Sequence, residues 1–296
     1  MARYIITLQA LGKELAWMLL QQARGIPEAK FKDDFLDEKT FVLLFARPDL
    51  SERLCITAAI RQMSGHTVYM GPEEHWTESV SQFPRALLGS ISYYMDGVIV
   101  HGLPTSSWMP EGNCIQFPVL NCGNMESHPA HALADIACMM RYSGDDLRKV
   151  RLAWIGAPTG ALFSLMEATA YFPFAIQVAL PQNAANIIIQ EQAAKLKTDI
   201  TFHETPVDAV QGCQFVMAGS SGQGRLSYEA VQAWSLNSDI MARAESDAHV
   251  LLGTNPMNCI PIEPAVLENR NSLVLLQSEN RLRVYKRMLH WLCEDY

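Results

Sequence analysis

Short apolar runs alternate with helical patterns along almost the whole chain, and this alternation constrains the fold more than any other feature. The run Thr40–Phe45 is almost entirely apolar, which is typical of a strand buried on both faces. A helical pattern follows it through Met63, and similar apolar runs occur at residues 96–101 and 118–121. Strands that alternate with helices form parallel sheets with helices on their faces. The first half of the chain therefore predicts an α/β domain.

The alternation restarts in the second half of the chain. Extended runs are expected at residues 150–156, 175–180, 198–203, 215–218 and 249–252, with helical patterns between them and a terminal helix at 282–292. A charged, turn-rich segment at residues 142–149 separates the halves, so we place the domain boundary there. Residues 71–83 are polar without periodicity and predict a mobile loop. The pattern as a whole predicts two doubly wound α/β domains.

Composition excludes two classes of partner. The chain has 296 residues, 49% of them hydrophobic, and a formal net charge of -8 without any run of like charges. Nucleic-acid binding needs clustered Lys and Arg, so nucleic acid is not expected as a partner. No apolar run reaches the roughly eighteen residues of a membrane span, so a membrane is not expected either.

The cysteines and the N-terminus indicate a cytoplasmic protein. The seven cysteines are odd in number and scattered, without a Cys-x-x-Cys pair. That pattern favours reduced thiols over a disulfide frame or a zinc site. The first residues contain one basic side chain, Arg3, and lack the long apolar centre of a secretory signal. We therefore expect a cytoplasmic protein, and we expect it to use no cofactor and no metal.

One junction in the middle of the chain gathers polar, titratable residues. The apolar run 117–120 leads into Asn121, and His128 and His131 stand where a helical pattern begins. Ligands of alternating α/β proteins usually bind at such strand-to-helix junctions. Histidines three residues apart on a helix face the same way, so with His101 they could ligate a metal. Three ordinary pocket histidines are the simpler interpretation, and His128 capping the helix with His131 packed internally is another.

Other polar groups have alternative interpretations as well. Asp49 and Glu52 lie three residues apart at a helix start, where acidic residues usually complement the helix dipole. The Gly-rich segment 219–224 looks like a phosphate cradle but lacks the Lys-Ser/Thr ending of a P-loop, which favours a surface loop. Cys122 is either a nucleophile or, as we favour, a buried structural thiol.

Several short motifs occur in a fixed order from one end of the chain to the other. They are the strand before Arg47, residues 118–121 followed by His128-Pro129, Trp154-Ile155-Gly156, Asn255-Pro256 and Glu279-Asn280-Arg281. In this order and spacing they resemble the aspartate/ornithine carbamoyltransferase family, and the last motif resembles the ornithine branch in particular. The resemblance implies the carbamoyltransferase fold, in which inter-domain helices join two doubly wound parallel-sheet domains.

The resemblance also implies what each domain does. Residues 1–141 would form a carbamoyl-phosphate-type domain, with helix 282–296 packing back on it, and residues 150–275 an amino-acid-binding-type domain. The family transfers the carbamoyl group of carbamoyl phosphate to an amino group. Arginines, hydroxyls and helix-end amides hold its phosphate, and fixed donors stabilise the charge that develops on the carbamoyl oxygen.

Four residues correspond to the catalytic positions of that family. His128 and Arg281 match residues that polarise the carbamoyl oxygen, so the resemblance implies the same role here. His101 stands where the family has an arginine, and His131 stands where it has a glutamine. We expect these two histidines to replace the lost donors.

The expected donor site departs from the family pattern. Where the family has Ser-Thr-Arg-Thr, this chain has Asp49-Leu50-Ser51-Glu52, and Arg53 matches the arginine that follows. A carboxylate within ~4–6 Å of a phosphate repels it. Each lost charge-assisted contact costs on the order of 1.5–3 kcal/mol. We therefore expect residues 49–53 to bind ordinary carbamoyl phosphate poorly or not at all.

The expected acceptor site is changed too. By the resemblance, the acceptor-binding residues are Asn121, Ser220, Ser221, Gly222, Asn255 and Pro256. Of the His-Cys-Leu-Pro motif of the ornithine branch, only the proline is kept. The loop that a neighbouring subunit contributes in the family corresponds to residues 71–83 and contains no lysine.

Two functions remain open at this point. The first is a divergent transferase that moves a carbamoyl or related acyl group to the amino group of an amino-acid-like acceptor, with an atypical donor site. The second is a catalytically inactive homologue that acts in binding or assembly. The retained polar groups favour the first, and the lost phosphate loop favours the second. The resemblance implies a homotrimer that binds a small amino-acid-like molecule.

Overall fold

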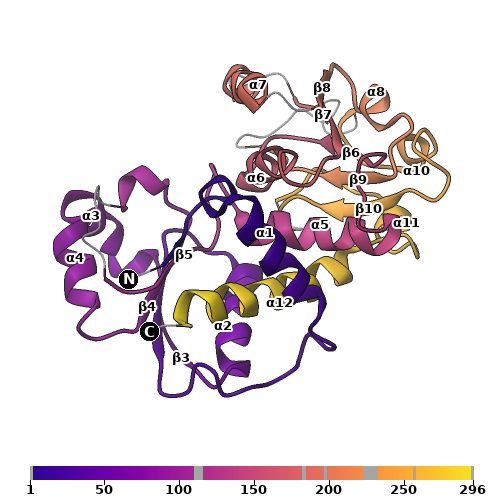
Figure 1. Cartoon of the computed structure of the whole chain (residues 1–296). Coiled ribbons are helices and arrows are strands. Elements are labelled where there is room, and N and C mark those ends of the chain that lie inside the picture. The colour runs from indigo at the N-terminus through magenta and orange to yellow at the C-terminus, as the bar shows by residue number, and fades with distance from the viewer. Residues whose placement is uncertain are drawn as a thin grey trace. The chain divides into compact units, whose positions relative to one another are not determined.

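The structure, a computed structural model, describes residues 3–109, 116–181, 185–196, 199–222, 233–255 and 258–294. The chain forms two compact units. The first comprises Met1–Ala134 and Glu279–Tyr296, and the second comprises Asp135–Ser278. Figure 1 colours the chain from indigo at the N-terminus to yellow at the C-terminus, so the yellow end of the last helix marks its return to the first unit.

Both divisions between the units fall inside helices. These are α5 (Pro129–Ser143) and α12 (Val274–Cys293). From the sequence, the boundary is expected at residues 142–149, which begin at the C-terminal end of α5. Residues 129–140 are buried without interruption, so α5 contains no exposed, turn-rich position at which the chain would divide visibly.

The first unit contains a five-stranded sheet whose strands all run parallel. The strands are β1 (Tyr4–Ile5), β2 (Thr40–Phe45), β3 (His66–Met70), β4 (Gly97–His101) and β5 (Val119–Asn121). In space they follow the order β1-β5-β4-β2-β3. In the register of β2 with β4, Phe45 lies opposite His101, so the two strands end together.

Helices cover both faces of this sheet, as Figure 1 shows. Besides parts of α5 and α12 they are α1 (Leu8–Arg24), α2 (Leu50–Gln62), α3 (Trp76–Gln82) and α4 (Pro84–Ile91), with 3-10 turns η1 (Pro72–Glu74) and η2 (Thr105–Ser107). On one face, Trp76 and Val80 of α3 and Leu88 of α4 pack against Val42 and Leu44 of β2. This packing fixes the central strands whose ends carry the site.

The second unit repeats the architecture with another five-stranded parallel sheet. Its strands are β6 (Arg151–Ile155), β7 (Ala175–Ala179), β8 (Ile200–His203), β9 (Phe215–Ala218) and β10 (His249–Leu252), in the spatial order β10-β9-β6-β7-β8. Its helices are α6 (Gly160–Ala168), α7 (Ala185–Leu196), α8 (Pro206–Val210), α10 (Ser238–Met241) and α11 (Pro264–Leu267). The two parallel-sheet α/β domains confirm the predicted fold class.

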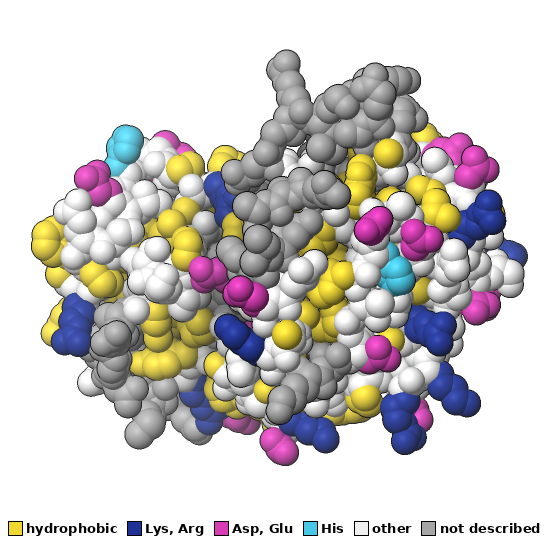
Figure 2. All heavy atoms as spheres, turned by 90° about the horizontal axis from the view of Figure 1, so that it is seen from above, with side chains coloured by type: hydrophobic (Ala, Val, Ile, Leu, Met, Phe, Trp, Pro, Cys, Tyr) yellow, Lys and Arg dark blue, Asp and Glu magenta, His cyan; other side chains and the backbone are white. Residues whose placement is uncertain are grey.

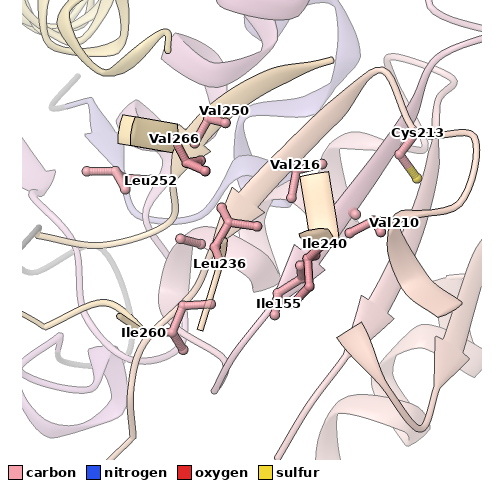
Figure 3. Close-up of a cluster of buried hydrophobic side chains, with 12 residues drawn as sticks. Ile155, Val210, Cys213, Val216, Leu236, Ile240, Val250, Leu252, Ile260 and Val266 are labelled. Carbon is pink, nitrogen blue, oxygen red and sulfur yellow. The ribbon is translucent and has the colours of Figure 1, made fainter. Parts of the chain in front are cut away.

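A cluster of buried aliphatic side chains covers one face of the second sheet (Figure 3). Ile155 and Val216 of the central strands lie under Ile240 of α10, and Val266 of α11 packs near Val250 of β10. Burying such a side chain contributes roughly 1.5–3 kcal/mol each relative to leaving it exposed. The cluster therefore holds the short helices α10 and α11, which have few backbone hydrogen bonds of their own, on the sheet.

The strand order reverses once in each sheet. In the first sheet β3 lies on one side of β2 and β4 on the other; in the second, β7 lies on one side of β6 and β9 on the other. Ligands of doubly wound sheets bind outside the carboxyl ends of the strands at this switch point. The segments after Phe45 and His101, and those after Ile155 and Ala218, are therefore the candidate places for a site.

Two of the predicted elements differ from those observed. Residues 71–83, predicted as a mobile loop, contain η1 and α3. Helix α3 has seven residues, so only Trp76 and Val80 mark its buried face, too few for a helical period to be visible. The terminal helix begins at Val274, not at residue 282. Its first turns bury the polar Gln277 and Asn280 and expose Leu275, so the apolar pattern of a helix is not visible there.

The described surface is mixed in charge. In Figure 2, Lys and Arg side chains are interspersed with Asp and Glu over the face shown. Within the part of the chain that the structure describes, no helix combines the length and the apolar character that crossing a membrane requires.

Candidate active site

Three segments of the first unit meet at the switch point of its sheet. Strand β2 is followed by Asp49, whose side chain caps helix α2 by accepting a hydrogen bond from the backbone N–H of Glu52 at 3.0 Å. Strand β4 ends at His101, and β5 leads into the segment from Asn121 to His128. Acidic residues are preferred at such a helix start, both as caps and as partners of the dipole. The local sequence thus explains why each segment turns at this edge.

Side chains of the segment after β5 hold its own backbone. The Asn121 side-chain amide donates to the carbonyl of Ile6 at 2.8 Å and accepts from the N–H of Gly123 at 3.0 Å. Asn124 Oδ1 accepts from the backbone N–H groups of Glu126 and Ser127, both at 2.8 Å. These bonds form two successive Asx turns, which fix the direction in which the chain enters α5.

Gly123 lets the ring of His128 come close to the chain. Its φ of +97° is one that L side chains rarely adopt. A Cβ at this position would lie 2.5 Å from Cδ2 of His128. Only glycine therefore fits both the turn and the packing, and the ring of His128 is directed by this contact.

The carboxylate of Glu52 is the centre of a buried polar cluster. Arg281 of α12 donates to Oε1 from Nη1 at 2.6 Å, and the hydroxyl of Tyr285 donates to Oε2 at 2.6 Å. His128 Nε2 lies 3.4 Å from Oε1, and Cys122 Sγ lies 3.7 Å from Oε2. Glu52 is 3% exposed. All five residues belong to the first unit.

The surroundings of Glu52 keep its carboxylate charged. Burial by itself acts to raise the pKa of the carboxyl group. The charges of Arg281 and His128 and hydrogen bonds from His128 and Tyr285 outweigh it, so the pKa lies well below its usual value. Conversely, burial, together with the nearby charge of Glu52, raises the pKa of the Cys122 thiol well above its usual value. The site therefore contains a carboxylate and a protonated thiol at neutral pH.

The hydrogen bonds assign the ring nitrogens of two histidines. His128 Nδ1 accepts from the backbone N–H of His131 at 3.4 Å, so Nε2, which faces Glu52, is the donor. His131 Nε2 accepts from Arg281 Nη2 at 3.3 Å. The rings of His128 and His131 meet edge to face with centroids 5.1 Å apart. His131 and Glu52 together thus hold Arg281.

His101 is held at the end of β4 as a neutral imidazole. Its Nδ1 donates to the carbonyl of Cys122 at 2.8 Å, and its ring stacks on Phe45 with centroids 4.8 Å apart. Burial is the largest influence on this group, and it lowers the pKa of the imidazole. With Nδ1 protonated, Nε2 is the acceptor nitrogen of this ring.

Two family models account for nearly the whole chain. The carbamoyl-phosphate-binding domain of aspartate/ornithine carbamoyltransferase matches residues 3–141, and the aspartate/ornithine-binding domain matches residues 148–292. The chain belongs to the aspartate/ornithine carbamoyltransferase family.

Relatives of this carbamoyltransferase-family chain lie on the ornithine side. It is 27% identical to an ornithine carbamoyltransferase of Nitratidesulfovibrio vulgaris over 98% of this chain and 99% of that protein. It is 24% identical to the ornithine carbamoyltransferase of Aquifex aeolicus over 100% and 99%. The solved ornithine carbamoyltransferase of Pyrococcus furiosus has the same fold, with a TM-score of 0.83, 21% identity and 100% and 98% coverage. That of Thermus thermophilus matches with a TM-score of 0.81 at 20% identity over 98% of each chain.

The residues predicted to form the donor site of this family member lie in different environments. Glu52 lies inside the buried cluster, whereas Leu50 is 64% exposed and Ser51 is half-buried. Asp49 caps α2, which is the ordinary role that the sequence offered as an alternative. The Arg53 guanidinium stacks over the ring of Tyr69 at 4.4 Å from its centroid. Of these residues, Glu52 contacts the predicted catalytic residues His128 and Arg281 directly.

The predicted acceptor residues divide between the two units. Asn121 uses its side chain to hold backbone, as described above. Ser220, Ser221, Gly222 and Asn255 belong to the second unit, and Pro256 lies outside the described residues. Ser220 pairs through its backbone with Ala157, with bonds of 2.7 and 3.0 Å, and its Oγ accepts from the N–H of Gly222 at 3.1 Å. Ser221 Oγ donates to the carbonyl of Asn258 at 3.2 Å.

Two members of the cluster were missed or misassigned from the sequence. Tyr285 was not singled out, although it stands four residues after Arg281 on one face of a helix, a spacing that brings side chains together. Glu52 was predicted in the donor segment as a carboxylate that would repel phosphate, whereas the structure pairs it with Arg281. Nothing in the sequence links Glu52 with a residue 229 positions away.

The described residues do not build a metal centre. Nowhere among them do three or more His, Cys, Asp or Glu side chains gather in a way that could hold a metal ion. His101, His128 and His131, which could have formed such a set by spacing, are instead bonded to a carbonyl, a carboxylate and a guanidinium.

Proposed function

We propose that the chain transfers a carbamoyl or related acyl group to the amino group of an amino-acid-like acceptor, and that its donor carries no phosphate dianion. The observation that carries this proposal is the 2.6 Å ion pair between Arg281 and Glu52. The positive charge that would attract a dianion is neutralised inside the protein. The family membership supports transferase chemistry, and the ion pair supports the unusual donor.

The cluster supplies the groups that such a transfer needs. When an amine attacks a carbonyl carbon, negative charge develops on the carbonyl oxygen, and preorganised N–H donors stabilise it. Arg281 and the Nε2–H of His128 are such donors. The attacking amine must lose a proton, and His101 is neutral with Nε2 as its acceptor nitrogen. When the new C–N bond has formed, the bond from the carbonyl carbon to the donor's leaving group breaks, and the leaving group departs with that electron pair. His131 orients Arg281 and is a positioning residue.

The test of this proposal is a search for ureido or acylamino products. The protein is incubated with a panel of amino acids and amines, first with carbamoyl phosphate and then with carbamoyl and acyl donors that lack phosphate. Products are identified by mass spectrometry. We expect product only with the second group of donors, and we expect His128→Ala to lower its rate. Efficient turnover of carbamoyl phosphate would contradict the proposed donor.

The second candidate is a catalytically inactive homologue that binds a small molecule or assembles with partners. It is favoured by the fact that the donors of the cluster already contact other groups of the cluster. Arg281 is bonded to Glu52 and His131, and Tyr285 is bonded to Glu52. Under this function no donor gives product, yet an amino-acid-like ligand still raises the melting temperature.

Three further expectations belong to the proposal. The family resemblance supports a homotrimer, which analytical ultracentrifugation tests directly. The thiol pattern supports a cytoplasmic location. The acceptor-binding role of residues 220–222 and Asn255 stands on the family resemblance, and substitution of these residues followed by measurement of acceptor KM tests it.

A further inference from the structure

The donors around Glu52 are arranged as in an anion-binding site, and the anion that they bind is the carboxylate of Glu52 itself. Arg281 and Tyr285 each donate to one carboxylate oxygen at 2.6 Å, and His128 Nε2 faces the first of these oxygens at 3.4 Å. The charged groups are desolvated, since the side chains of Glu52 and Arg281 are 4% and 12% exposed. A free carboxylate bound at this place would make the same contacts.

The balance of charge around the cluster disfavours additional anions. Asp49 lies close enough for its charge to act on both His101 and Cys122, so it adds a second negative charge to that of Glu52. Within the cluster, the guanidinium of Arg281 is already paired with Glu52. A phosphate dianion placed beside Glu52 and Asp49 would be repelled by each carboxylate. An uncharged or cationic ligand is not repelled.

We propose that Glu52 is the specificity-determining residue of this site, because its carboxylate lies against the oxyanion-binding donors and shares them, excludes phosphate dianions and selects uncharged or cationic ligands. The link to catalysis rests on the proposed transferase function, whereas the anion site itself does not. If Glu52 is a built-in ligand, its removal creates a site for a small external carboxylate. A glutamate that only fills space creates no such site.

The experiment is chemical rescue of Glu52→Ala by formate. The melting temperature is measured with increasing sodium formate and, at equal ionic strength, with sodium chloride. We expect a saturable rise of several degrees in formate for Glu52→Ala, because a ligand that binds only the folded state stabilises it by mass action. The wild type and Glu14→Ala, which alters an exposed glutamate of α1 in the same unit, should show no difference between the salts.

A second variant identifies the donor that holds the formate. In Glu52→Ala combined with Arg281→Met the guanidinium is absent, so the difference between formate and chloride should disappear. Should Glu52→Ala fail to stay folded in chloride, the refolding yield in formate against chloride replaces the melting temperature. Equal values in the two salts for Glu52→Ala, or an equal formate effect in the wild type, overturn the proposal.

Orthophosphate and the transfer assay complete the test. We expect orthophosphate to leave the melting temperature of the wild type unchanged relative to chloride at equal ionic strength. A saturable rise in the wild type would overturn the exclusion of dianions. If formate rescues Glu52→Ala but no donor yields product with the wild type, the proposed transferase function fails while the anion site stands. Product without rescue removes the anion site and leaves the transferase function in place.

Discussion

The switch points of the two sheets are held by different kinds of interaction. In the first unit, Glu52, Arg281 and His128 form a buried cluster of charged and titratable side chains at the ends of β2, β4 and β5. In the second, the ends of β6 and β9 are joined mainly through backbone, with Ala157 paired to Ser220 and Ser220 paired to Cys259. Two sheets of the same topology thus differ at their switch points. Side chains interact there in the first unit, whereas in the second unit backbone hydrogen bonds form what we call the frame, at Ala157, Ser220 and Cys259.

Small residues make the second frame possible. Gly219 and Gly253 leave room for the indole of Trp154, since a Cβ on either would lie within 2.5 Å of it. The Trp154 Nε1–H in turn donates to the carbonyl of Gly156 at 3.1 Å. Where backbone bonds and an aromatic ring fix the loops, no charged side chain is needed to hold them. We infer that substitutions should be costly at different kinds of position in the two units.

The largest expected effect comes from breaking the buried ion pair of the first unit. Arg281→Met leaves the Glu52 carboxylate buried without its cation, which typically costs about 3–5 kcal/mol. Urea denaturation at neutral pH measures the loss, with Arg270→Met at an exposed position of the second unit as the matched control. A loss no larger than that of the control would contradict the view that the cluster holds the first unit together.

The second prediction concerns the pH dependence of the same cluster. The pKa of Glu52 is lowered in the folded state, so its contribution is fully present above the ordinary value of 4.5 and is lost as pH falls through the folded pKa. The stability difference between the wild type and Glu52→Gln should therefore be greatest at neutral pH and shrink below pH 4.5. The other titrating groups are present in both proteins. A difference that stays constant down to acid pH would show that Glu52 acts by shape and not by charge.

The difference between local strand patterns and long-range side-chain pairs explains which features could be predicted from the sequence. Alternation of apolar runs predicted both parallel sheets, because strand burial is local information, and Thr40–Phe45 and residues 215–218 were placed at their observed bounds. The pairing of Glu52 with Arg281 joins residues far apart in sequence, so no local pattern contains it. The resemblance placed Arg281 at a catalytic position but did not indicate its partner. The backbone bridges at Ser220 depend on no side-chain signal at all.

Each unit has a glycine with positive φ near its switch point, and the cost of replacing it by alanine can be compared between the units. Gly123→Ala requires a φ of +97° and places a Cβ 2.5 Å from His128, so the ring must move as well. Gly222→Ala requires a φ of +85° but places its Cβ at an ordinary 3.6 Å from that of Ala157. Backbone strain of this kind costs on the order of 1–3 kcal/mol. We expect Gly123→Ala to lose clearly more stability than Gly222→Ala by urea denaturation, and equal losses would mean that the His128 ring yields freely.

The smallest expected effect is that of Ser220→Ala in the second unit. The hydroxyl accepts one hydrogen bond, from the N–H of Gly222 at 3.1 Å, in a half-buried loop. A single neutral hydrogen bond contributes about 0.5–1.5 kcal/mol, and the backbone pairing of Ser220 with Ala157 is independent of the side chain. Stability should therefore fall only slightly.

The kinetics of Ser220→Ala show whether this loop also binds the acceptor. If Ser220 contacts an amino-acid-like acceptor, its loss raises the KM for the acceptor and leaves that for the donor unchanged. If KM is unaffected, the second switch point is a frame alone, and the acceptor must be bound elsewhere.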